Sequence, residues 1–175
     1  MYEVDNRDRV VELGGVPPSD AGAPLPAVVS DELNVLVAYI VERPDPSWDG
    51  TYATMVGRET GDQSIAIIRF RSPRAHLFGP PNDEAFSGHP LYARGLRPYS
   101  SAEVQASSWI RKLERMNSVH PSHRPERYAS DRHFILAFHD STFECIAEGF
   151  DVQYVHGTMR GALEYMAKLV AEDEG

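Results

Sequence analysis

One apolar run, residues 33–41, constrains the fold of this chain more than any other feature. Apolar residues occupy both sets of alternate positions in it, namely Leu33, Val35, Val37, Tyr39 and Val41 in one set and Leu36, Ala38 and Ile40 in the other. A strand that is apolar on both faces has to be covered on both faces. The sequence therefore predicts a central strand inside a layered domain.

Shorter segments with strand character surround this run. They are residues 51–56, 64–70, 101–106, 133–139 and 143–155. Asp49-Gly50 is a tight-turn signal before the first of them, so the first two extend the central strand into an antiparallel meander. Asp140, Ser141 and Thr142 supply turn chemistry between the last two, which predicts a C-terminal hairpin.

Two helices are expected. Ser107 or Ser108 can cap a helix that ends near residue 118, and Gly157-Thr158 precede a C-terminal helix with an apolar stripe. We therefore predict an α+β fold: a single domain with a mainly antiparallel sheet, covered by the C-terminal helix and one further helix, with long irregular loops. Its expected parts are a Pro/Gly-rich extended arm at 1–31, a globular core at 32–171 and an acidic tail at 172–175.

Composition and charge exclude several classes of function. The 175 residues carry a formal charge of −9, which disfavours nucleic acid as a partner. No apolar stretch is long enough to cross a bilayer, and the N-terminal residues lack the pattern of a signal peptide. Cys145 is the only cysteine, so no intramolecular disulfide can form. These features predict a cytoplasmic protein without a membrane partner.

Positive charge is concentrated between residues 94 and 132. Eight basic residues stand there against four acidic ones, and all but one of the eight are arginines. Guanidinium groups suit carboxylates, phosphates and internal ion pairs equally well. The segment, called the arginine-rich island below, is therefore either an ion-paired framework or a site for an anion.

The loop at 76–92 concentrates side chains that can carry chemistry. Asn82 and Asp83 are candidate ligand-binding residues, and Glu84 and His89 are candidate acid and base groups. The alternative is purely structural, because Asn82 is a good helix cap, acidic residues suit the first turn of a helix, and Gly88 and Pro90 would end it.

The predicted hairpin bend holds a second set of candidates. His139 and Glu144 are candidate catalytic groups and Asp140 a candidate ligand-binding residue, since a carboxylate beside an imidazole raises its basicity. Alternatively, His139 only organises the turn. Strand alternation places Cys145 on the face opposite Glu144, which favours a buried structural thiol over a nucleophile.

These candidates support two hypotheses of function. In the first, a small anionic or carboxylate-bearing molecule binds in a pocket lined by the 76–92 loop, the 120–132 loop and the 139–144 hairpin. Arg124 and Arg127 supply positive charge to this pocket. The hypothesis allows acid/base or metal-assisted chemistry there. No metal ligands are assigned, because Pro121 disfavours a helical pair of His120 and His123, and the cofactor is unknown. In the second, the protein is a noncatalytic acidic module that binds a basic protein partner. A homodimer is compatible with both.

Overall fold

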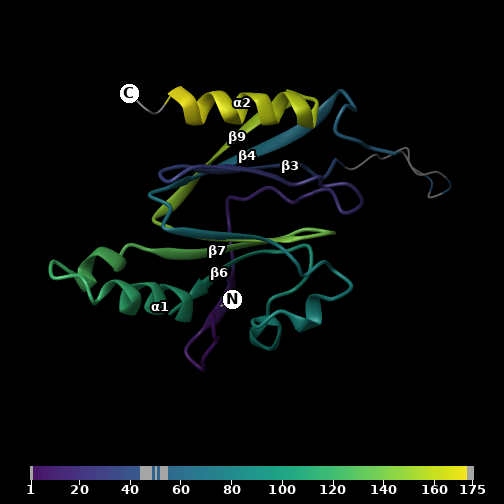
Figure 1. Cartoon of the computed structure of the whole chain (residues 1–175). Coiled ribbons are helices and arrows are strands. Elements are labelled where there is room, and N and C mark those ends of the chain that lie inside the picture. The colour runs from purple at the N-terminus through teal and green to yellow at the C-terminus, as the bar shows by residue number, and fades with distance from the viewer. Residues whose placement is uncertain (1, 44–48, 50, 52–54, 173–175) are drawn as a thin grey trace.

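Two antiparallel sheets stack face to face, and a helix lies on the outer side of each (Figure 1). The computed structural model describes residues 2–43, 49, 51 and 55–172. The five-stranded sheet has the order β1-β6-β7-β8-β5 and the four-stranded sheet the order β2-β3-β4-β9. The strands are β1 (Arg9–Glu12), β2 (Ala27–Ser30), β3 (Val35–Ile40), β4 (Gln63–Arg71), β5 (Ala75–Gly79), β6 (Ser101–Gln105), β7 (Arg132–Ala137), β8 (Thr142–Ala147) and β9 (Gly149–Gly157). The helices are α1 (Ser108–Asn117) and α2 (Met159–Glu172), with short 3-10 turns η1 (Phe86–Gly88), η2 (Tyr92–Arg94) and η3 (Pro125–Tyr128).

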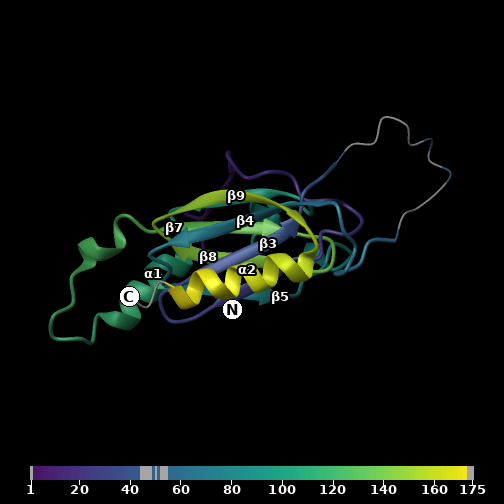
Figure 2. The ribbon, with the colours of Figure 1, turned by 90° about the horizontal axis from the view of Figure 1, so that it is seen from above.

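The predicted central strand is β3, and all six of its residues are buried. One set of its side chains packs between the sheets, where Tyr39 contacts Phe138 with ring centroids 5.2 Å apart. The other set packs under α2, against Met159 and Met166. Figure 2, a view from above, shows α2 lying along this sheet. The α+β fold predicted from the two-faced apolar run is thus confirmed, with each face covered by a different layer.

The outer face of the five-stranded sheet has a different cover. Trp109 of α1, Tyr2 near the N-terminus, and Phe86, Leu91 and Leu96 from the connection between β5 and β6 pack against it. Ser107 caps α1 by accepting the Ile110 amide, as expected for a serine at this position. The long connection after β5 therefore belongs to the core.

The predicted single sheet is in fact two sheets, because the expected strand at 143–155 is two strands. β8 ends at Ala147, and β9 starts at Gly149 in the other sheet, where it pairs with β4. The Arg71 guanidinium lies over Gly149, where an added Cβ would approach Arg71 Nη2 to 2.2 Å. A residue without a side chain lets the chain turn closely past β4 at this crossing. The core-facing apolar positions change phase here, from Phe143, Cys145 and Ala147 in β8 to Phe150 and Val152 in β9, and the prediction of one continuous strand overlooked this change.

The N-terminal arm contributes edge strands to both sheets. β1 pairs with β6, and β2 pairs with β3. Between them the proline-rich stretch forms no strand. It is still bonded to β3, because the Pro17 carbonyl accepts a hydrogen bond from the Tyr39 hydroxyl and the Pro24 carbonyl accepts one from the Ile40 amide. The strand expected at 51–56 and the tail expected at 172–175 fall mainly on residues outside the described ranges, and the division into arm, core and tail stays a prediction. Within those ranges no helix has the length and apolar character needed to cross a membrane.

Candidate functional site

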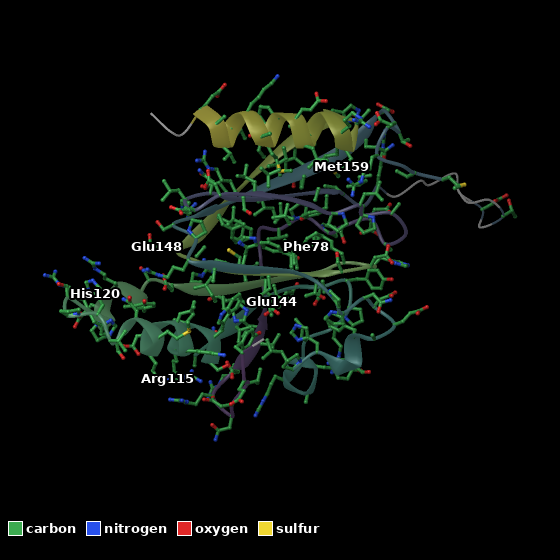
Figure 3. All side chains as sticks on the ribbon, in the orientation of Figure 1. Phe78, Arg115, His120, Glu144, Glu148 and Met159 are labelled. Atoms are coloured by element: carbon green, nitrogen blue, oxygen red, sulfur yellow. The ribbon has the colours of Figure 1, made fainter. Side chains whose placement is uncertain are left out.

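A buried carboxylate lies at the centre of the five-stranded sheet, on the face turned toward α1 (Figure 3). It belongs to Glu144 of β8, whose residue is only 2% exposed. Its Oε2 is 2.6 Å from the Tyr2 hydroxyl and 2.9 Å from His133 Nε2, and its Oε1 is 3.3 Å from His89 Nε2. Strand register explains the contact with His133, because Glu144 pairs with Ile135 and His133 is the next side chain on that face of β7. We call these four residues the Glu144 cluster.

The positions of the protons in the Glu144 cluster follow from its outer partners. The Leu91 amide can only donate, and it lies 3.2 Å from His89 Nδ1, so His89 carries its proton on Nε2 and donates to Glu144. Ser107 Oγ accepts the Ile110 amide and is 3.0 Å from His133 Nδ1, and either of these two atoms can donate to the other. In both cases His133 Nε2 donates to Glu144, so the carboxylate accepts three hydrogen bonds.

Ser107, His133 and Glu144 form a continuous hydrogen-bonded line. The residue types are those of a serine nucleophile, its base and the acid that orients the base. Ser107 is only 3% exposed, however, and its oxygen already caps α1. A nucleophile must reach its substrate, so this line stabilises the junction of α1 with the sheet and does not present a reactive hydroxyl.

The N-terminal segment covers the Glu144 cluster. The Tyr2 ring stacks on Trp109 with centroids 5.1 Å apart and planes 6° from parallel. Asp8 is buried and accepts the Ser108 amide at the start of α1 at 2.6 Å. Burial and the neighbouring Glu144 carboxylate both raise the pKa of Tyr2, so its phenol stays a donor. Residues 2–8 are thus fixed both to the carboxylate and to the helix.

Burial alone would raise the pKa of Glu144, but hydrogen bonds from His133 and His89, the positive charge of His133 and a hydrogen bond from Tyr2 lower it from 4.5 to about 2. A carboxyl whose pKa is lower in the folded than in the unfolded state stabilises the fold above the unfolded value, and loses that effect as the pH falls toward the folded value. We expect the free energy of unfolding to drop by about 3 kcal/mol between pH 4.5 and pH 2 from this group alone. Urea unfolding at a series of pH values measures the drop.

The control for this pH dependence is a Glu144→Gln variant measured over the same range. It lacks the titrating group, so its stability should fall less steeply with acid than that of the unmodified protein. Parallel pH profiles would show that other carboxyl groups account for the acid sensitivity.

The second predicted set of residues forms a separate cluster at the surface. His139 Nδ1 is 2.9 Å from Asp140 Oδ1, and this hydrogen bond raises the pKa of His139. The Tyr99 hydroxyl donates to Asp83 and lowers the pKa of that carboxyl, while the Asp83 amide donates to the His139 carbonyl at 2.9 Å. Asn82 accepts the Ala85 amide and so closes a turn before η1, but η1 itself begins after Ala85 and has no side-chain cap.

The structure separates the predicted candidates. It brings His89 to Glu144 in the buried cluster, leaves His139 and Asp140 with Asp83 at the surface, and exposes Glu84. The 76–92 loop and the 139–144 hairpin of the hypothesised pocket do meet, since Thr142 donates to the Pro81 carbonyl at 2.9 Å. The shared acid and base pair of the two histidines is not assembled, because one is buried against Glu144 and the other is not.

The 120–132 loop of the hypothesised pocket lies at the opposite end of the five-stranded sheet from the 139–144 hairpin. Residues 120–131 precede the first residue of β7, whereas His139 follows the last one, so the length of the strand separates them (Figures 1 and 3). Arg74 donates to the Arg127 carbonyl and pairs with Asp131. Arg124 and Arg127 are therefore not placed to bind a ligand held by the hairpin.

A basic cleft of 600 Å³ lies between residues 3–5 and α1. Its lining residues are Glu3, Val4, Asp5, Ser108, Arg111, Lys112, Arg115 and Met116. Arg111 Nη2 is 2.6 Å from Asp5 Oδ2, which holds this guanidinium against the N-terminal segment. Ser108 Oγ and Arg111 Nε are buried and have no hydrogen-bond partner among the described residues. Three members of the arginine-rich island thus share one cleft, whereas Arg132 is paired with Glu103.

Sequence reasoning missed two members of the Glu144 cluster. His133 could have been found, because alternation with Ile135 and Ala137 places it on an apolar face, where an imidazole needs a polar partner. Tyr2 could not, because it lies 142 residues from Glu144 and no local pattern connects them. Cys145 is fully buried on the other face and burial raises its pKa, in accord with the structural thiol expected there.

Chemically, the Glu144 cluster can hold a buried negative charge and the basic cleft can attract an anion. Among the described residues no group of three or more histidine, cysteine or acidic side chains is arranged to bind a metal ion. No protein-family model, curated protein or solved structure matches this chain.

Proposed function

We propose that the protein binds a small anionic molecule in the basic cleft beside α1. The observation that supports this proposal is the convergence of Arg111, Lys112 and Arg115 on one cleft of 600 Å³, in a chain whose formal charge is −9. Asp5 pairs with Arg111 and Glu3 also lines the cleft, but among the described residues neither Lys112 nor Arg115 forms an ion pair, so these two charges remain for an anion. The cleft replaces the three-loop pocket expected from the sequence as the place where the ligand binds.

The spacing of the basic residues favours a ligand with several anionic oxygens. Arg111 and Arg115 are four residues apart, so their side chains leave the same face of α1 one turn apart, and Lys112 follows Arg111. Asp5 orients the Arg111 guanidinium from the N-terminal segment. A phosphate or a di- or tricarboxylate can accept hydrogen bonds from several of these groups at once, through oxygens that match the planar fork of a guanidinium.

The buried Ser108 hydroxyl supports the same site. Its Oγ has no partner among the described residues, although the residue is only 6% exposed and lines the cleft. A buried polar atom without a hydrogen bond is costly, and a bound oxyanion would supply the missing acceptor. Asp8 already occupies the Ser108 amide, so the ligand would rely on side chains and not on the backbone at the start of α1.

The proposal is one of binding and not of catalysis. The residues predicted as acid or base groups, His89, His139, Glu84 and Glu144, are not among those that line the cleft. The rival proposal, a noncatalytic acidic module with a basic protein partner, predicts no anion bound at α1. We keep a cytoplasmic location in the proposal, because the single cysteine gives no disulfide framework for an oxidising compartment.

Calorimetric titration with inorganic phosphate and with citrate tests the anion site. We expect Lys112→Gln and Arg115→Gln each to weaken binding by about tenfold or more, the loss of one charge-assisted hydrogen bond. Lys168→Gln is the matched control, because it removes a lysine charge from exposed α2 on the opposite side of the molecule. An equal loss in the control would mean nonspecific attraction, and unchanged affinity in the two cleft variants would contradict the proposal.

A further inference from the structure

Glu144 also borders a second, smaller cavity. This cavity has a volume of 160 Å³ and is lined by Leu77, Phe78, Gly79, Pro80, Thr142 and Glu144. In the register of β5 and β8, Leu77 is opposite Glu144 and Gly79 is opposite Thr142. Gly79 has no neighbour within 4 Å of the position where a Cβ would stand, so the absent side chain leaves this part of the sheet face open.

The walls of the cavity are apolar except at Glu144. Leu77 and Pro80 supply hydrocarbon, and the Thr142 hydroxyl is already bonded to the Pro81 carbonyl. The volume is close to the ~150 Å³ of an engineered apolar cavity that holds benzene. The cavity therefore suits a body of a few carbon atoms with one polar end.

The protein partners of the Glu144 carboxylate do not fill all of its hydrogen-bond acceptor positions. Oε2 accepts two hydrogen bonds, at 2.6 Å and 2.9 Å, but Oε1 has a single contact, at 3.3 Å. Each carboxylate oxygen can accept about two hydrogen bonds, so Oε1 retains room for one more donor. A buried carboxylate is stabilised by each further charge-assisted hydrogen bond that it accepts. A ligand with a positively charged donor group would supply one to Oε1.

We propose that the cavity beside Glu144 binds a small primary ammonium ion with a short apolar body. The ammonium group donates to the carboxylate, and the alkyl part contacts Leu77 and Pro80. An anion is disfavoured here by the charge of Glu144, so this site is chemically distinct from the basic cleft. The two proposals stand or fall separately, because no lining residue is shared between the two cavities.

Three probes of similar size distinguish charge from shape. The protein, labelled with ¹⁵N, is titrated at neutral pH with n-butylammonium, butan-1-ol and butyrate, and the amide signals of Leu77, Thr142 and Glu144 are followed. We expect saturable shifts at these residues with the ammonium probe, and binding of the alcohol at least about tenfold weaker, since the alcohol lacks the charge. Equal or tighter binding of the alcohol or of butyrate, or an absence of saturable shifts with the ammonium probe, would overturn the proposal.

A variant that keeps the Glu144 cluster intact tests the location. Leu77→Trp fills the cavity from its partly exposed rim without altering any hydrogen bond to the carboxylate. It should abolish the saturable shifts at Thr142 and Glu144. Leu33→Trp is the control, because it places the same side chain at a position that is 77% exposed and outside the cavity. If Leu77→Trp binds n-butylammonium as the control does, the cavity is not the site.

Discussion

A Glu144→Gln variant should lose about 2–4 kcal/mol of unfolding free energy at neutral pH, although the two side chains have nearly the same shape. The carboxylate accepts hydrogen bonds from Tyr2, His133 and His89 at once. An amide has one accepting oxygen, and its NH2 group would face at least one imidazole N–H as a second donor. A buried donor would then be left without a partner. Equilibrium urea unfolding of both proteins measures the difference.

Glu148→Gln provides the matched control for this prediction. Glu148 is four residues along the chain, exposed, and bonded through its side chain to the Ser130 hydroxyl. Its substitution should change the unfolding free energy by less than about 0.5 kcal/mol, as is usual at the surface. If Glu144→Gln is equally harmless, the carboxyl group is protonated in the folded protein, and the case for a bound ammonium ion fails with it.

A Trp109→Ala variant should be destabilised by about 3–5 kcal/mol, the range for deleting a large aromatic side chain from a core. Trp109 is 7% exposed, stacks on Tyr2 and meets the edge of the His133 ring at 5.2 Å. Its loss removes the contact that holds Tyr2 over Glu144 as well as the buried area. Thermal and chemical unfolding measure the effect.

The size of the Trp109 effect can be checked against two other substitutions. Trp109→Phe keeps a ring to stack on Tyr2 and should recover part of the lost stability. Tyr154→Ala removes an aromatic residue that is 62% exposed, and it should cost less than about 0.5 kcal/mol. A small loss for Trp109→Ala, comparable to that for Tyr154→Ala, would mean that the N-terminal segment does not depend on α1 for its position.

The elements of the fold were predictable where local periodicity determines them. The two-faced apolar run became β3, the Ser107 cap began α1, and the Asp140–Thr142 turn joined β7 to β8. The end of β8 could have been suspected from the sequence, because the apolar positions change phase across Gly149, but that change does not show that β9 pairs with β4 in a second sheet. Local pattern specifies which face of a strand is apolar, but not which layer covers it.

The candidate site shows the same division between local and distant information. Residue types and loop position singled out Glu144 and His89, and the structure brings these two together. The sequence suggested His139, just after β7, as the partner of Glu144. In the structure Glu144 is bonded instead to His133, the second residue of β7. The expected role of the arginine-rich island also depended on contacts across the fold, because Asp5 orients Arg111 from 106 residues away.

The contacts of residues 2–8 also bear on the order in which the chain can fold. The Tyr2 hydroxyl has its partner 142 residues further along the chain, and Asp8 has its partner 100 residues further along. During synthesis these residues must therefore wait until α1 and β8 have been made, and native contacts of such long range slow folding. The segment that covers the buried carboxylate is thus expected to dock late, so the Glu144 cluster closes only after α1, β7 and β8 are in place.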